Sequence, residues 1–224
     1  MDSGSNEILP PQLTAVQKLV SLFIPVRILK SSSPENPTLE LFYYKGQWQL
    51  GTEDATYSDG DRYTPLLVGF GAVAERLNEV KHVGVLGAGL GSAAIILEKM
   101  GLTPEISLVD VDEEVLRIAR SVMPVEDSRI NYICSDARLF LESGPKFDLL
   151  VVDLFKGRVV PDFVQEAAFL KECKAAIGKD GMLVLNYIAN EPVKWKGFLE
   201  TFRSVFPEHE VIKNGMNRVL TVKA

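Results

Sequence analysis

The chain has 224 residues, 46% of them hydrophobic, and a formal net charge of −6. That length and apolar content suffice for a sizeable buried core, whereas the negative charge argues against a nucleic-acid partner, which requires a basic face. Cys134 and Cys173 are the only cysteines and both stand within apolar patterns, so we expect reduced core residues and a cytoplasmic protein.

The first 29 residues predict neither a secretion signal nor a membrane span. Residues 1–12 ("MDSGSNEILPPQ") lack the basic and apolar regions of a secretion signal. Residues 19–29 ("LVSLFIPVRIL") are apolar but too few to span a bilayer, and they include Pro25 and Arg27. We expect this segment to pack on the core as a strand or helix, with peripheral membrane contact as the alternative. No membrane partner is predicted.

Residues 1–60 are predicted to form a small β-rich domain. Turn residues separate short segments that are rich in β-branched and aromatic residues: "FIPVRILK", "TLELFYY" and "QWQLG". Lys45 and Gly46 stand between the second and third segments, where a hairpin would reverse. The aromatic residues of this hairpin are expected to pack within the small domain or against another subunit.

Residues 61–224 alternate apolar strand-like segments with helical ones, and residues 59–77 supply the first helix. The strand-like segments are "HVGVLG", "EISLVDV", "INYIC", "FDLLVVD" and "GMLVLNYI". Strands that are apolar on both faces and joined by crossover helices form a mostly parallel sheet covered on both sides. Two further strand-like pieces flank Asn214 and Gly215, so an antiparallel hairpin should close the sheet. The sequence therefore predicts an α/β fold.

A glycine-rich turn, "GAGLGS", follows the first of these strands. Its glycines, Gly87, Gly89 and Gly91, allow a sharp turn and the close approach of a ligand, and the next helix begins with unpaired N–H groups. The carboxyl edge of an open α/β sheet is the usual ligand site. The alternative is a turn that only packs the helix on the strand.

The next strand ends at Asp110, where a carboxylate can accept both hydroxyls of a ribose. Capping of the following helix is the alternative role, but Asp112 fits it better. A dinucleotide fingerprint would place a glycine five residues after Gly87, and Ser92 stands there instead. The sequence therefore favours a nucleoside ligand other than NAD.

The closer G-x-G-x-G spacing resembles the first motif of class I S-adenosylmethionine-dependent methyltransferases, which implies a Rossmann-like fold. The segment "ICSDARLFL" extends the resemblance. It implies that Asp136 faces the adenine amino group and Ala137 the ring, while Asp136 can also cap the next helix. The residues predicted to bind the nucleoside are Gly87, Ala88, Gly89, Leu90, Gly91, Asp110, Val111, Asp136 and Ala137.

Within that superfamily the layout resembles the spermidine synthase family, which has a small N-terminal β-domain, a nucleoside-binding domain and a catalytic loop after the fourth strand. "DGDRYTPLL" places Asp59 and Tyr63 at the separation of an acid and a tyrosine in that family, and "FDLLVVDLFKG" is similar to its fourth strand and loop. The resemblance implies that Asp153 is the general base and that Tyr63 contacts substrate. It also implies a possible homodimer.

The chain departs from that family at three acidic positions. The family reads G-G-G-D-G-G, and Leu90 occupies its acidic position here; Lys156 replaces a second acid three residues after Asp153. The family also has a polar residue and a glutamate after the tyrosine, where this chain has Thr64 and Pro65. Lys156 and Arg158 would repel a dicationic diamine, whereas losing acids suits the carboxylate of intact S-adenosylmethionine. Alternatively, Lys156 and Arg158 are charges on a solvated loop.

These observations predict a spermidine synthase-like transferase that binds S-adenosylmethionine or a related thioether nucleoside, such as its decarboxylated form or methylthioadenosine. We expect methyl transfer to a small acceptor that is not a polycation, with Asp153 as the base and Lys156 in contact with substrate. One alternative is a polyamine aminopropyltransferase. A non-catalytic nucleoside-binding or scaffold protein is the other.

Other chemistry-bearing residues give weaker patterns. His82 and His209 have no second histidine or cysteine nearby, so no metal is predicted. The sequence has no G-x-S-x-G motif, which argues against an α/β-hydrolase. Asn186 and Tyr187 end the fifth strand, where they would either line the site or only terminate the strand.

Overall fold

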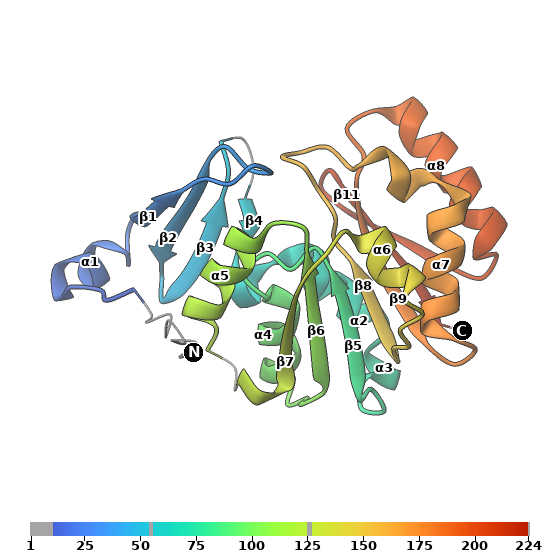
Figure 1. Ribbon diagram of the computed structural model, residues 1–224, viewed down its shortest axis with the longest axis horizontal. Coiled ribbons are helices and arrows are strands. Elements are labelled where there is room, and N and C mark those ends of the chain that lie inside the picture. The colour runs from blue at the N-terminus through green and yellow to red at the C-terminus, as the bar shows by residue number, and fades with distance from the viewer. Residues whose placement is uncertain (1–10, 54–55, 125–126, 224) are drawn as a thin grey trace, which may run out of the picture.

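The computed structural model describes residues 11–53, 56–124 and 127–223. It consists of a four-stranded sheet in the order β1-β2-β3-β4 and a seven-stranded sheet in the order β10-β11-β9-β8-β5-β6-β7 (Figure 1). Residues 1–10, on which the expectation about a secretion signal depends, lie outside the described residues. The predicted α/β fold, with a small β-structure before a larger mostly parallel sheet, is confirmed.

The small sheet is antiparallel throughout. Its strands are β1 (Val26–Ser31), β2 (Leu39–Tyr44), β3 (Gln47–Gly51) and β4 (Thr56–Ser58). Lys45 and Gly46 turn between β2 and β3 with φ of 48° and 80°, and positive φ at both central residues is typical of a tight hairpin turn. The hairpin is therefore the one that the sequence predicted, whereas β4 is an addition.

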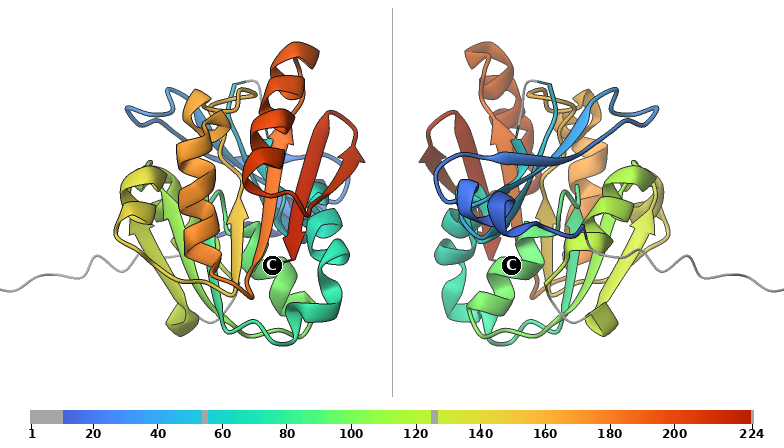
Figure 2. Two further views of the ribbon diagram at one scale, coloured as in Figure 1. Left: turned by 90° about the vertical axis from the view of Figure 1, so that its right-hand side faces the viewer. Right: turned by 90° about the vertical axis from the view of Figure 1, so that its left-hand side faces the viewer.

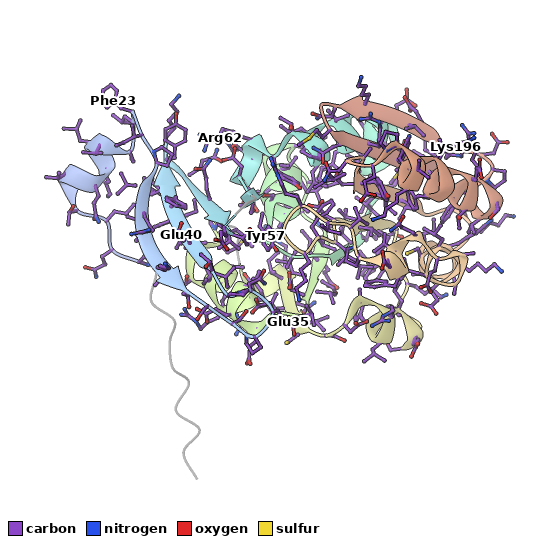
Figure 3. All side chains as sticks on the ribbon, turned by 90° about the horizontal axis from the view of Figure 1, so that it is seen from above. Phe23, Glu35, Glu40, Tyr57, Arg62 and Lys196 are labelled. Atoms are coloured by element: carbon purple, nitrogen blue, oxygen red, sulfur yellow. The ribbon has the colours of Figure 1, made fainter. Side chains whose placement is uncertain are left out.

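The apolar segment around residue 22 does not pack on the core as expected. Helix α1 (Ala15–Val20) buries none of its residues, and Leu22, Phe23 and Ile24 after it are 52%, 76% and 59% exposed. Phe23 points away from the rest of the molecule (Figure 3). The reason is position: the segment precedes β1, which is an edge strand. Among the described residues, no helix is long and apolar enough to cross a membrane.

The larger sheet has five parallel strands and a C-terminal antiparallel pair. The parallel strands are β5 (His82–Leu86), β6 (Glu105–Asp110), β7 (Ile130–Cys134), β8 (Leu149–Val152) and β9 (Met182–Ile188). The pair is β10 (Glu210–Asn214) and β11 (Asn217–Lys223), and β11 joins β9. The predicted hairpin at Asn214 and Gly215 is confirmed.

Helices cover both faces of this sheet, as expected for strands that are apolar on both sides. One face packs against α2 (Thr64–Ala72), α3 (Ala74–Leu77) and α4 (Ser92–Lys99). The other packs against α6 (Ala137–Glu142), α7 (Ala167–Ile177) and α8 (Pro192–Val205). Figure 2 shows α2 and α7 on opposite sides of the sheet. The single helix predicted over residues 59–77 is instead a 3-10 turn (Gly60–Arg62) followed by α2 and α3.

The two sheets are joined by an apolar cluster of their own. Leu39, Leu41 and Leu50 of the small sheet pack against Leu90 of the glycine-rich turn and against helix α5 (Glu113–Val122). The hydroxyls of Ser58 on β4 and Ser92 on α4 also lie 2.6 Å apart and are buried. The small sheet is thus fixed above the turn where the nucleoside was predicted to bind.

The two cysteines differ in environment. Cys173 is buried in helix α7, as predicted, but Cys134 is exposed. The expectation for Cys134 was wrong because it ends β7, which lies at the edge of the sheet. An apolar strand pattern does not reveal which strand takes an edge position.

Candidate active site

A cavity of about 1050 Å³ lies between the small sheet and the carboxyl ends of β5, β6, β7 and β8. That volume is at the upper end of the range for small-molecule sites, about 300 to 1,000 Å³. Most of the predicted site residues line it: Tyr63, Gly87, Ala88, Gly89, Asp110, Val111, Asp136, Ala137, Asp153 and Lys156. The fold therefore brings residues from five separate segments to one hollow.

Two predicted contacts, Leu90 and Gly91, do not line the cavity. Leu90 is 1% exposed and packs in the cluster beneath the small sheet. Gly91 precedes helix α4 with φ of 76°, and a Cβ there would lie 2.2 Å from the Met123 methyl group. Both residues lie on the side of the turn away from the cavity. Their positions therefore do not favour direct contact with a nucleoside.

Gly87 sets how closely the turn approaches the loop after β8. Its φ is 88°, and a Cβ at this position would lie 2.2 Å from the carbonyl oxygen of Asp153. A side chain would therefore be strained and would push the loop away. Because Gly87 has no side chain, the glycine-rich turn can lie directly beside Asp153.

Asp110 is held at the end of β6 by two backbone amides. Its Oδ2 accepts from Ala88 N at 3.0 Å and its Oδ1 from Asp112 N at 3.0 Å. Burial raises its pKa to about 6, although these bonds favour the charged form. Asp112, not Asp110, caps helix α5 by accepting from Glu114 N at 2.9 Å. Each Asp110 oxygen has a further lone pair for a hydroxyl donor.

Asp136 caps helix α6, which was one of the two roles considered for it, by accepting from Arg138 N at 2.8 Å. It also lines the cavity. The Arg138 guanidinium also contacts both carboxylate oxygens, at 3.1 and 2.9 Å. These bonds hold the pKa of Asp136 below its usual value.

Asp153, at the end of β8, forms a small hydrogen-bonded cluster with Tyr63 and Asn186. Its Oδ1 accepts from the Tyr63 hydroxyl at 3.2 Å and from Asn186 Nδ2 at 2.8 Å, while Nδ2 also lies 3.3 Å from the Tyr63 oxygen. Burial raises the pKa of Asp153 to about 6 despite both bonds. Burial and the nearby carboxylate raise the pKa of Tyr63 well above its usual value, so Tyr63 remains a donor.

Asn186 and Tyr187, which the sequence left open, separate in the structure. Asn186 is 2% exposed, and its Oδ1 has no hydrogen-bond partner among the described residues. Tyr187 turns to the opposite face, where it stacks on Phe198 and bonds to Gln165. Only Asn186 belongs to the site, and the signal for it is a polar residue near the carboxyl end of an otherwise apolar strand.

The small sheet and its loops contribute charges that the sequence did not suggest. Among the described residues, seven carboxylates and three basic side chains line the cavity. The basic residues are Arg62, Lys156 and Arg158, and the acids are Glu35, Glu40, Glu53, Asp59, Asp110, Asp136 and Asp153. Arg62 is bonded to Asp59 at 2.9 Å, and the Lys156 side chain is 73% exposed. The cavity wall is therefore net negative, contrary to the expectation based on Lys156 and Arg158 alone. Within the described ranges, no group of three acidic, histidine or cysteine side chains is placed to hold a metal.

The architecture is the Rossmann-like fold of class I methyltransferases, with the cavity at the carboxyl edge of its parallel strands. Residues 60–210 match the spermine/spermidine synthase domain, which is most of the chain, so the chain belongs to that family. A solved structure of a probable spermidine synthase from Corynebacterium glutamicum superposes with a TM-score of 0.72 and 18% identity, covering 89% of this chain and 80% of that one.

Two further relatives are similar. A spermidine synthase in complex with the transition-state analogue AdoDATO has a TM-score of 0.67 and 16% identity, covering 87% of this chain and 72% of that one. The polyamine aminopropyltransferase of Vibrio vulnificus is 27% identical over 150 residues, or 62% of this chain and 49% of the relative. The chain spans about half the length of the curated relatives that it matches.

Proposed function

We propose that this chain transfers an aminopropyl group from decarboxylated S-adenosylmethionine to a small amine. The observation that carries the proposal is the position of Asp153, held by Tyr63 and Asn186 beside the Gly87 turn. Family membership and the aminopropyltransferase relatives support this reaction over the methyl transfer that the sequence favoured.

The residues of the cavity fit an adenosyl group. Asp110 offers carboxylate oxygens to a ribose, Asp136 offers a charged acceptor to an adenine amino group, and Ala88 and Val111 supply apolar walls. When bound, the sulfonium donor supplies an electrophilic carbon next to positively charged sulfur. Because that carbon is already activated, the protein has mainly to position the two substrates.

Asp153 would receive the proton that the reaction releases. The amine nitrogen forms a C–N bond as the C–S bond breaks, the electron pair of that bond goes to sulfur, and a proton leaves the nitrogen for the carboxylate. With a pKa near 6, Asp153 is mostly ionised at neutral pH yet is a stronger base than an exposed aspartate. Tyr63 and Asn186 orient it through Oδ1.

Methyl transfer from S-adenosylmethionine itself is the second candidate. It is favoured by Leu90, an apolar side chain in the part of the turn where the related synthases carry an acid. Leu90 itself packs beneath the small sheet and does not line the cavity, so the turn presents no carboxylate to the amino group of a decarboxylated donor. The net negative cavity wall favours a cationic acceptor in either reaction.

A product analysis tests the proposal. The chain is incubated with putrescine and either decarboxylated or intact S-adenosylmethionine, and the products are identified by mass spectrometry. We expect methylthioadenosine and aminopropylated amine from the decarboxylated donor only, and neither product from Asp153→Asn. S-Adenosylhomocysteine and methylated amine from the intact donor would instead support methyl transfer.

A further inference from the structure

The hydroxyl of Tyr57 joins the loop after β8 to the loop between β1 and β2. It accepts a hydrogen bond from the backbone N–H of Gly157 at 2.8 Å and donates one to Asn36 Oδ1 at 3.0 Å. Tyr57 lies on β4 and lines the cavity. Figure 3 shows it on the side of the small sheet that faces the larger sheet, with Glu35 of the β1–β2 loop nearby. One hydroxyl thus connects three segments that are far apart in sequence.

The same network continues to the predicted ribose site. Asn36 Nδ2 donates to Asp112 Oδ2 at 2.6 Å, and the Ser33 hydroxyl bonds to the same oxygen. The backbone N–H of Asp112 in turn donates to Asp110 Oδ1. Hydrogen bonds therefore run from Gly157, four residues after Asp153, through Tyr57, Asn36 and Asp112 to Asp110.

Other contacts of the loop are weaker or lie on its far side. Lys156 and Glu35 are 3.8 Å apart and largely exposed, and such surface pairs contribute little. Arg158 O accepts from Asn190 Nδ2 at 3.0 Å, outside the small sheet. The turn itself is closed by the Lys156–Val159 bridge. The Tyr57 bond is thus a strong candidate for fixing where this turn sits above the cavity.

We propose that Tyr57 is a positioning residue that couples nucleoside binding at Asp110 to the position of the loop that follows Asp153. A nucleoside that orders Asp110 and the start of α5 would favour the arrangement in which Asn36 and Tyr57 hold Gly157. The ordered loop would then favour binding of the amine beside Asp153. Because coupling between two binding sites is reciprocal, the amine would raise nucleoside affinity by the same factor. This inference rests on the proposed function for the identity of the two ligands.

Hydrogen exchange gives a readout that does not require turnover. Exchange of the backbone amides of residues 154–160 is measured with and without methylthioadenosine in the wild type and in Tyr57→Phe. We expect methylthioadenosine to slow exchange in the wild type, and Tyr57→Phe to exchange at least tenfold faster at Gly157 with little protection by the ligand. The proposal is overturned if Tyr57→Phe exchanges like the wild type or keeps the full protection.

Two further variants separate coupling from general loosening. Tyr43→Phe removes a hydroxyl from the same sheet at a residue that packs on Trp48 and does not line the cavity, so it should behave as the wild type. Asn36→Ala interrupts the network without changing β4 and should reproduce Tyr57→Phe. An Asn36→Ala protein with normal loop protection would contradict the proposal.

The experiment also distinguishes this inference from the proposed function. If no donor is turned over but methylthioadenosine protects the loop through Tyr57, the coupling stands and the reaction is misassigned. If aminopropyl transfer occurs, Tyr57→Phe should lower kcat more than it raises the KM for the nucleoside, since it leaves Asp110 in place. An unchanged kcat would contradict the positioning role.

Discussion

At the scale of single residues, the base that we propose, Asp153, is buried at a cost to stability. Burial raises its pKa from an ordinary value near 4 to about 6, so the folded state binds a proton more tightly than the unfolded chain. The destabilisation from its charge is therefore absent below about pH 4 and develops as the pH rises through about 6. Burial of the charged Asp153 carboxylate therefore lowers the stability of the fold at neutral pH, so a purely structural role does not explain why an aspartate is buried here.

Asp153→Asn should consequently stabilise the protein while it removes activity. At pH 8 we expect its free energy of unfolding to exceed that of the wild type by about 1 to 3 kcal/mol, because one pKa unit corresponds to about 1.4 kcal/mol. The difference should vanish near pH 4. Urea unfolding at both pH values measures it.

Asp136→Asn is the matched control with the opposite sign. The Arg138 contacts lower the pKa of Asp136, so its stabilising effect is present at neutral pH and is lost as the pH falls through that lowered pKa. The variant should therefore be less stable than the wild type at pH 8. If Asp153→Asn also lowers the free energy of unfolding at pH 8, the buried charge of Asp153 does not destabilise the folded state.

Asp110 gives a separate test of where the nucleoside lies. Asp110→Ala should weaken methylthioadenosine binding by about 1 to 3 kcal/mol, since the ribose hydroxyls and the two backbone amides lose their acceptors. Asp110→Asn, which keeps one acceptor oxygen, should lose less. Titration calorimetry on both variants decides the point, and unchanged affinity would place the ribose elsewhere.

At the scale of elements, the glycine-rich turn has two sides with different tasks. Gly87, Ala88 and Gly89 face the cavity, whereas Leu90 packs under the small sheet. The sequence could predict the turn from its glycines. It could not predict which residues of the turn face the cavity, because that depends on where β2 and β3 lie.

Leu90→Asp should therefore unfold the junction between the sheets. A carboxylate buried among Leu39, Leu41 and Leu50 has no partner there, and we expect a loss of about 3 kcal/mol or more in the free energy of unfolding. Leu90→Met, which conserves volume, should cost less than about 1.5 kcal/mol. A stable Leu90→Asp protein with a new affinity for putrescine would instead mean that this side chain reaches the cavity.

At the scale of the whole molecule, the sequence predicted features that depend on local pattern better than features that depend on long-range contacts. The apolar runs of β5, β6, β8 and β9 indicated buried parallel strands, and Asn214 with Gly215 indicated the final hairpin. These are local signals. The exposure of Cys134 and Phe23 depends on which strands take the edges, and no local pattern carries that order.

The site shows the same division. Asp110, Asp136 and Asp153 could be predicted because each lies at the carboxyl end of a strand of one sheet or within two residues after it. The Tyr57 network could not, because it depends on how the small sheet packs on the larger one. The negative cavity wall was likewise missed, since Glu35 and Glu40 come from the small sheet and its loops.

The central claim is that the cavity between the two sheets holds an adenosyl group and an amine on either side of the transferred carbon. A crystal structure of the chain with methylthioadenosine and putrescine tests it most directly. We predict the ribose hydroxyls on Asp110, the amine nitrogen within about 2.6 to 3.2 Å of Asp153, and Gly157 still bonded to Tyr57. A nucleoside bound away from Gly87 and Asp110, or an amine that does not reach Asp153, would contradict it.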